Sequence, residues 1–278
     1  MLKRIITGAG YVAVMLAMFL LRQKIDYRFF HILTMFITVI GTYEMVRAIS
    51  PWADENLSFI AIALSGLLVP LYLAVEYVLS PENGFKVALI YIFVAVIAVA
   101  IVSIVRKFAF KKFIINVSPF LYPTIFTTFM LYANEMGINT GFIVLALSFL
   151  IAPISDTVAY FTGSLIGGKK LCPKLSPKKT WSGAIGGVIG GVLISVAFFF
   201  LFKNRIYVKV ASPLWFFIII GFFASIIGIL GDLFESFIKR RANVKDSGKI
   251  LPGHGGVLDR FDSTFFIIMF LSIVFTIV

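Results

Sequence analysis

Nine long apolar stretches recur along this chain of 278 residues, and they limit what it can fold into. They cover about residues 5–21, 29–48, 57–79, 86–105, 115–133, 141–165, 181–202, 213–233 and 257–278. A helix that crosses a bilayer needs roughly 20 apolar residues. Only 14% of the residues are charged, against about 25% in soluble chains. The sequence therefore predicts an all-α, polytopic membrane helix bundle with about nine transmembrane helices.

The basic residues set the expected orientation, because loops on the cytoplasmic side of a membrane are enriched in Lys and Arg. A cytoplasmic N-terminus places 18 of the 25 Lys and Arg residues on the inner side and 7 on the outer side. We therefore expect a multi-pass protein of the inner cell membrane with a cytoplasmic N-terminus. The net charge of +12 follows this topology, so it does not indicate a nucleic-acid partner.

The polar motifs divide the chain into two expected parts. Residues 1–140 should form N-terminal transmembrane helices with few distinctive polar groups. Residues 141–278 should form a catalytic transmembrane region with cytoplasmic loops at 166–182 and 234–258. In the seventh apolar stretch, three overlapping G-x-x-x-G pairs between Gly183 and Gly191 predict close packing against a neighbouring helix. The single cysteine, Cys172, excludes an internal disulfide.

The stretch 239–263 lies between two apolar segments and combines acids, bases and a glycine-rich turn. Asp259 and Asp262 are three residues apart, which puts both carboxylates on one face of the last helix. They could simply cap that helix, but Asp246 lies upstream in the same loop. Clustered carboxylates suit Mg²⁺, which usually binds one or two of them together with substrate phosphates.

Basic side chains accompany these acids, as expected where a polyanion binds together with a metal. They are Lys239, Arg240, Arg241, Lys245 and Lys249. The glycines of the turn, Gly253, Gly255 and Gly256, allow the backbone to approach a ligand closely. His254 is either a proton carrier or a structural residue of the turn.

Two further polar groups belong to the second half of the chain. Asp232, Glu235, Ser236 and Lys239 follow one another at three- and four-residue steps, as a polar stripe at the end of the eighth helix. A second polar loop, residues 155–183, opens with Asp156 and closes with Ser176, Lys178, Lys179 and Thr180. Its lysines with Ser and Thr suggest a phosphate-binding group.

The remaining acids have simpler explanations. Asp26, Asp54, Glu55 and Glu82 fall in loops, where they are solvated. Glu44, Glu76 and Glu135 fall near helix ends, where an interfacial position explains them about as well as a functional role does.

Carboxylates, many Lys and Arg and a glycine-rich turn at a membrane interface are the groups that metal-assisted phosphoryl or nucleotidyl transfer uses. The alternative of another class is an ion-coupled transporter or channel with Asp156, Asp232 and Asp259 along a cation path. Against it, the acids gather at one expected membrane face. A CDP-alcohol phosphotransferase would show the string D-G-x-x-A-R, which this sequence lacks.

The polar motifs resemble those of the phosphatidate cytidylyltransferase (CDP-diacylglycerol synthase) family. The first match comprises Ser236, Lys239, Arg240, the run 245–248, the run 251–256 and the run 259–262. A second region is similar through Ser155, Asp156, Gly163, Gly167, Lys169 and the run 176–183. The exception is Ser182, where the family pattern has an acid. The resemblance covers roughly residues 155–263.

The resemblance implies that CTP and phosphatidic acid react to CDP-diacylglycerol and pyrophosphate, with Mg²⁺ and a second cation such as K⁺. Lipid would enter from the bilayer and CTP from the cytoplasm, and a homodimer is one possible arrangement. We expect catalytic roles for Lys239, Arg240, Asp246, His254 and Asp259, and metal binding by Asp156, Asp232, Asp246, Asp259 and Asp262. Substrate binding is expected from Ser176, Lys178, Lys179, Thr180, Lys245, Gly255, Gly256 and Arg260.

Overall fold

The computed structural model describes residues 2–79, 81–206, 210–251, 253 and 255–278. These residues form nine α-helices, a short 3-10 helix at Lys203–Arg205 and two strands. The helices are α1 (Leu2–Lys24), α2 (Phe29–Ile49), α3 (Glu55–Val78), α4 (Pro81–Val105), α5 (Phe110–Glu135), α6 (Ile138–Ile166), α7 (Trp181–Phe202), α8 (Pro213–Arg241) and α9 (Leu258–Ile277). The strands are β1 (Lys170–Cys172) and β2 (Ser176–Thr180).

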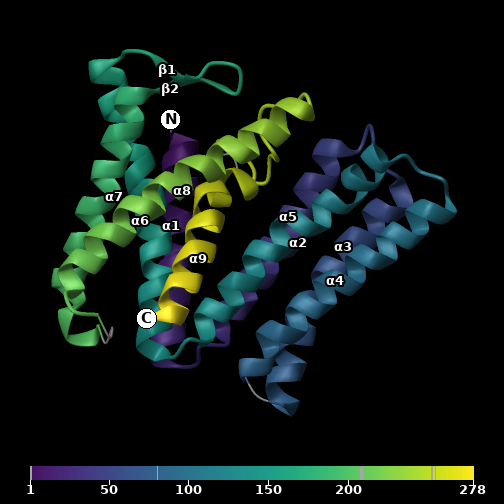
Figure 1. Cartoon of the computed structure of the whole chain (residues 1–278), viewed down its shortest axis with the longest axis horizontal. Coiled ribbons are helices and arrows are strands. Elements are labelled where there is room, and N and C mark those ends of the chain that lie inside the picture. The colour runs from purple at the N-terminus through teal and green to yellow at the C-terminus, as the bar shows by residue number, and fades with distance from the viewer. Residues whose placement is uncertain (1, 80, 207–209, 252, 254) are drawn as a thin grey trace. The chain divides into compact units, whose positions relative to one another are not determined.

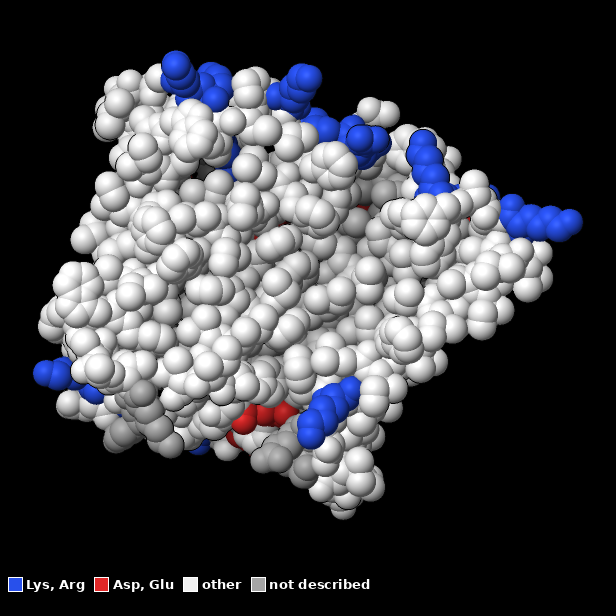
Figure 2. Space-filling model, viewed as in Figure 1, with Lys and Arg blue, Asp and Glu red and all other residues white. Residues whose placement is uncertain are grey.

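Eight of the described helices, α2 to α9, are long and apolar enough to cross a membrane. Large apolar side chains along them are exposed, among them Phe59, Phe93, Leu193 and Phe200, each at more than 60%. On the face shown in Figure 2, Lys and Arg lie mainly near the outline of the view, and the broad area between them is almost entirely without charged side chains. Such a surface suits lipid chains, and the predicted all-α membrane bundle is confirmed.

The helix bounds follow the apolar stretches closely, with two informative differences. The fifth stretch contains Pro119 and Pro123 and was the least regular by sequence, yet α5 runs through both prolines. The carbonyl of Ile115, which loses its helical partner because Pro119 has no N–H, accepts the hydroxyl of Ser118 at 3.1 Å. The eighth helix continues to Arg241, so part of the expected loop 234–258 is helical.

The chain forms two compact units. Unit 1 comprises Met1–Glu135 and Ala242–Arg260, and unit 2 comprises Met136–Arg241 and Phe261–Val278. Unit 1 therefore holds α1 to α5 together with the loop that follows α8. In it, α2 packs on α3 and α5, and α4 packs on the same two helices. Figure 1 shows α2, α3, α4 and α5 running side by side.

Unit 2 is held together by close approach of α7 to α6 and α8. A methyl group at Gly190 would lie 2.8 Å from a methyl of Val158 on α6. A methyl group at Gly191 would lie 3.0 Å from Cβ of Ser225 on α8. Real side chains keep larger separations, so only glycine at these positions lets the backbones come this near. The helix packing expected from the G-x-x-x-G pairs is confirmed.

A β-hairpin that the sequence did not predict connects α6 to α7. β1 and β2 pair antiparallel, and the hairpin lies beyond the ends of both helices (Figure 1). Gly167 and Gly168 precede it with φ of +67° and +104°. Side chains with a Cβ rarely adopt such angles, so these two glycines turn the chain out of α6. Most lysines of the expected loop 166–182 therefore belong to a short β-hairpin instead of an irregular loop.

Candidate functional site

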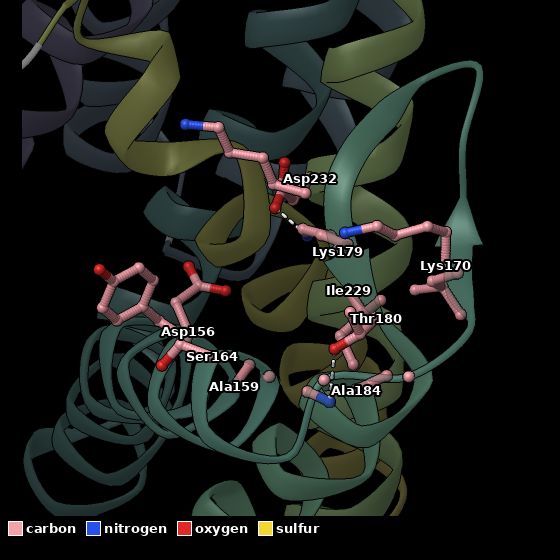
Figure 3. Close-up of a pocket in the computed structure, with 16 residues that line it drawn as sticks. Asp156, Ala159, Ser164, Lys170, Lys179, Thr180, Ala184, Ile229 and Asp232 are labelled. Carbon is pink, nitrogen blue, oxygen red and sulfur yellow. Dashed lines mark hydrogen bonds and ion pairs between the residues drawn. The ribbon is translucent and has the colours of Figure 1, made fainter.

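A cavity of about 500 Å³ opens in unit 2 where the hairpin meets α6, α7 and α8. Asp156 on α6 and Asp232 on α8 line it from different helices, and Lys179 lines it from β2 (Figure 3). Lys178, also on β2, belongs to the lining as well. Glycines at the end of α6 and the start of α7 line the rest, together with apolar groups such as Ile229. The cavity thus combines opposite charges with close access to the backbone.

The start of α7 forms the floor of this cavity. Thr180 caps the helix, because its hydroxyl accepts the N–H of Gly183 at 3.1 Å (Figure 3). The hydroxyl of Ser182 donates to the carbonyl of Gly167 and lies 3.0 Å from the Thr180 hydroxyl. The N–H of Trp181 donates to the carbonyl of Lys169 at 3.0 Å. These bonds fix the hairpin to α7, and with it the two cavity lysines.

Lys179 forms an ion pair with Asp232 inside the cavity (Figure 3). The two side chains are 25% and 20% exposed, so water screens their attraction only in part. Ser236, one turn further along α8, places its hydroxyl 3.4 Å from the same carboxylate. Asp232 therefore stands at the point where the lysines of the hairpin meet the polar stripe of α8.

The polar stripe of α8 continues away from the cavity towards the helix end. Glu235 is fully buried, and the ammonium of Lys239 lies 3.5 Å from its carboxylate. Arg240 donates through Nε to the carbonyl of Leu175 in the hairpin at 3.3 Å. Asp262 on α9 is hydrogen-bonded to Glu235 and lies near enough to Asp232 to feel its charge. Three acids from two helices thus lie close together in unit 2.

Lys179 and Lys239 balance Asp232 and Glu235, and Asp262 adds a third carboxyl group beside them. Neighbouring carboxylates repel unless a proton or a cation lies between them, so a further cation would be favourable at Asp262. Across the described parts of the chain, no three His, Cys, Asp or Glu side chains are arranged as a complete metal site. Mg²⁺ does not need one, since it binds through one or two carboxylates and takes its other ligands from water and phosphates. Asp232 and Asp262 are the donors best placed for this in unit 2.

The loop after α8 belongs to unit 1 and carries the second group of predicted residues. Asp259 accepts the N–H of Ser247 at 2.9 Å and the N–H of Gly256 at 2.8 Å. Gly255 has a φ of +84°, and a side chain there would lie 2.7 Å from the Asp259 carboxylate. Asp259 therefore holds Ser247 close to Gly256, a structural role that agrees with its position at the start of a helix. Its role as a metal ligand stays a prediction.

A second cavity, of about 690 Å³, opens on this loop. Its charged lining consists of Lys245, Asp246, Lys249 and Arg260, all exposed. Gly248, Gly253 and Gly255 supply backbone to the lining. Three cations against one acid favour a polyanionic ligand.

The structure thus groups the predicted residues into two sets. In unit 2 it brings together Asp156, Lys178, Lys179, Thr180, Asp232 and Asp262, with Ser176, Lys239 and Arg240 on the same elements. In unit 1 it brings together Lys245, Asp246, Gly255 and Arg260, with Gly256 and Asp259 behind them. His254 and Pro252 lie outside the described residues.

One residue of this second set was missed by sequence reasoning. Glu44 on α2 is fully buried and accepts the N–H groups of Val257 and Leu258, each at 2.9 Å. The only signal in the sequence was an acid inside an apolar stretch, and an interfacial position explained that equally well.

The profile described as "Cytidylyltransferase family" matches residues 2–278 of the chain. A phosphatidate cytidylyltransferase of Staphylococcus saprophyticus is 43% identical over 126 residues, which are 45% of this chain and 46% of that protein. One of Bacillus subtilis is 42% identical over 117 residues, covering 42% of this chain and 41% of that protein. One of Rickettsia bellii is 39% identical over 143 residues, with 48% and 57% covered. The matched part spans about half the length of these curated relatives.

Proposed function

The chain belongs to the cytidylyltransferase family, and we propose that it transfers the cytidylyl group of CTP to phosphatidic acid. The products are CDP-diacylglycerol and pyrophosphate, so the enzyme would serve phospholipid biosynthesis. The three relatives named above carry the name phosphatidate cytidylyltransferase. The proposal extends that activity to this chain.

The observation that supports the proposal most is the cavity of unit 2. It joins Asp156 and Asp232 to Lys178 and Lys179 over a glycine-lined floor, at the end of helices that could span a membrane. A lipid phosphate and a nucleotide meet at such an interface, where cations balance phosphate charge. An ion path would instead be expected to carry acids through the depth of the bilayer.

In the proposed reaction an oxygen of the lipid phosphate attacks the α-phosphorus of CTP. One P–O bond forms, and the bond between the α-phosphorus and its bridging oxygen breaks in line, so pyrophosphate leaves with that electron pair. A phosphate monoester is already largely ionised at pH 7, with a second pKa of about 6, so the attack needs no strong general base. Catalysis then rests on positioning and on neutralising charge.

The residues of unit 2 would hold the phosphates of both substrates. Lys178 and Lys179 would contact the triphosphate, with Ser176 and Thr180 beside them on β2. When the nucleotide binds, the ammonium of Lys179 would exchange the Asp232 carboxylate for a phosphate oxygen, because the two anionic groups compete for it. Lys239 and Arg240 on α8 would stabilise charge that develops as the bridging bond breaks.

We propose that the loop of unit 1 binds pyrophosphate as a released product. Lys245 and Arg260 supply charge around its cavity, and Gly255 and Gly256 keep the backbone close to the ligand. Asp246 is an exposed acid among these cations, available to share a metal bound to the phosphates. His254 is proposed to hydrogen-bond the pyrophosphate or to give it a proton.

Mg²⁺, when bound, would neutralise charge on the transferred phosphate. Asp232 and Asp262 are the proposed ligands in unit 2, with Asp156 as a support. Asp246 and Asp259 remain proposed ligands in unit 1. A second cation such as K⁺ belongs to the proposal through the family resemblance, as does a homodimer.

We place the reaction at the cytoplasmic face of the inner cell membrane, because most basic loops fall on that side in the sequence-derived topology. CTP would arrive from the cytoplasm, and phosphatidic acid would reach the site from the bilayer.

The deciding experiment incubates the purified protein with CTP, phosphatidic acid and Mg²⁺ and detects CDP-diacylglycerol and pyrophosphate. Omitting the lipid distinguishes transfer from hydrolysis of CTP. Ion flux in liposomes without CTP turnover would contradict the proposal. In folded Asp232→Asn protein we expect turnover to fall by at least about 100-fold and Mn²⁺ binding to weaken.

Replacing Lys178 and Lys179 together by Ala should raise the CTP concentration needed for half-maximal rate by at least about ten-fold, as expected for lost charge-assisted bonds to phosphate. Lys174→Ala is the matched control, because Lys174 is exposed on the same hairpin and does not line the cavity. A CTP titration that is the same in the double variant and in the control would place the triphosphate elsewhere.

A further inference from the structure

Glu44 is a buried carboxylate on α2 that binds the start of another helix, α9. It belongs to α2, yet the two N–H groups that it accepts come from Val257 and Leu258, more than 200 residues away along the chain. Leu258 is the first residue of α9. The first N–H groups of a helix have no partner within the helix, and a negative charge is favourable at this end. Glu44 therefore satisfies the N–H of Val257, just before α9, and the N–H of Leu258, at its first position, with a group of matching charge.

The loop approaches Glu44 so closely that side chains are excluded at two positions. A Cβ on Gly248 would lie 2.6 Å from the carboxyl carbon of Glu44, and one on Gly256 would lie 2.7 Å from it. Contacts shorter than about 3.0 Å are essentially never seen for a real Cβ, so both positions require glycine while Glu44 is in place. The backbone of the loop thus wraps the carboxylate from two sides.

The same helix also holds the beginning of the loop. Ala242 is buried against Ala48 and Ile49 at the end of α2, and Val244 packs on the same cluster. The loop is therefore fixed to α2 at 242–244 through apolar contact and at 256–258 through Glu44. Between these points, Asp259 binds the N–H groups of Ser247 and Gly256.

The outer side of the loop carries the cavity lined by Lys245, Asp246, Lys249 and Arg260. Gly248 and Gly255 line the cavity as well. Gly248 faces Glu44 so closely that movement of one changes the position of the other. A shift of this backbone would separate cations that must act on one ligand.

We infer that Glu44 is the positioning residue of this polyanion cavity: it does not touch the ligand, but holds the described parts of the loop, 242–251 and 255–258, in the shape that binds a pyrophosphate-like group. The inference rests on the proposed function for the identity of the ligand. By this inference, α2 contributes to ligand binding through Glu44, and an interfacial position is not the only reason for this acid. A carboxylate is required because the two N–H groups bind its two different oxygens, and Gln would turn its NH2 group, itself a donor, towards one of them.

Glu44→Gln is the sharpest test, because it keeps shape and removes one acceptor. We expect the amides of Val257 and Leu258 to exchange hydrogen at least about ten-fold faster, the change that the loss of one buried bond produces. The Kd of inorganic pyrophosphate should rise at least about ten-fold. Glu55→Gln is the matched control, since Glu55 is exposed at the start of α3 in the same unit and should leave both values unchanged.

Binding of pyrophosphate separates positioning from general destabilisation. Partial unfolding raises the measured Kd only in proportion to the loss of folded protein, so a ten-fold rise in protein that is still mostly folded reports the position of the loop. Equal exchange and equal Kd in Glu44→Gln and Glu55→Gln would overturn the inference. So would faster exchange with an unchanged Kd, or wild-type protein that binds no pyrophosphate.

Gly248→Ala tests the same contact from the loop side and decides the matter if Glu44→Gln does not fold. Its methyl group would push the loop from the carboxylate, so the same two changes are expected, and wild-type values would contradict the inference. Absence of CDP-diacylglycerol formation by the wild type would count against the proposed function alone. Hydrogen exchange and pyrophosphate binding are measured without turnover.

Discussion

The contact between Gly191 on α7 and Ser225 on α8 allows a quantitative test of how unit 2 is assembled. A methyl group at position 191 would lie 3.0 Å from Cβ of Ser225 and closer still to its hydroxyl. The hydroxyl is committed, since it donates to the carbonyl of Gly221 at 2.7 Å. Ser225 is fully buried, so α8 itself must move to make room in Gly191→Ala.

Overpacking of this kind typically costs about 1–3 kcal/mol. For a chain of this size, 1 kcal/mol corresponds to about 2–4 °C in Tm, so we expect Gly191→Ala to lower the Tm of the detergent-solubilised protein by about 2–12 °C. Gly66→Ala is the control. Its methyl group would meet only Val39 at 3.9 Å, and replacing a helical glycine by Ala favours the helix by up to about 1 kcal/mol.

A second substitution identifies the clash as the cause. Ser225→Gly removes the atoms nearest to the new methyl group and leaves Ile151 as its next neighbour, at 3.4 Å. The cost of Gly191→Ala should therefore largely disappear in the Ser225→Gly background, a coupling of about 1–3 kcal/mol between the two positions. Equal Tm values for Gly191→Ala and Gly66→Ala, or a cost that persists without Ser225, would refute the reasoning.

Two further predictions concern stability at the helix ends. Thr180→Ala removes the hydroxyl that caps α7, so the free energy of unfolding should fall by about 1 kcal/mol, while Thr180→Ser should keep most of it; thermal melts of both variants check this, and equal losses would contradict the cap. Burial and the hydrogen bond to Glu76 raise the pKa of Tyr27 to about 12, against about 10 in an unfolded chain. The unfolded chain then releases this proton first, so stability should fall from pH 10 to pH 12; Tyr27→Phe should make that fall smaller, and an identical pH profile would argue against the shift.

Much of the fold follows from local sequence, because the bilayer imposes a length on every apolar segment. All nine apolar stretches became helices within the described residues. The hairpin at 170–180 was missed because two short strands with three lysines have neither apolar alternation nor a typical pair of turn residues between them. The apolar stretch predicts an end for α8 at residue 233, but the helix continues to Arg241. Its last turns are polar and contain the stripe, so they carry no apolar signal.

The candidate site could be predicted only where its residues cluster in the chain. Asp232, Glu235 and Lys239 share one helix, so their spacing indicated a common face. The pairing of Lys179 with Asp232 joins residues on different elements, and no local pattern specifies it. Glu44 is the extreme case, because its partners are contributed by a segment more than 200 residues away.

Ser182 shows how one departure from the family pattern can be understood from local chemistry. Its hydroxyl donates to the carbonyl of Gly167, a bond that an ionised carboxylate at this position could not make, because it has no proton to give. The cap of α7 does not depend on that bond, since Thr180 supplies it. The serine thus ties the end of α6 to the start of α7 through a neutral contact. The cavity keeps the charge of Asp156 and Asp232 without a third acid at its floor.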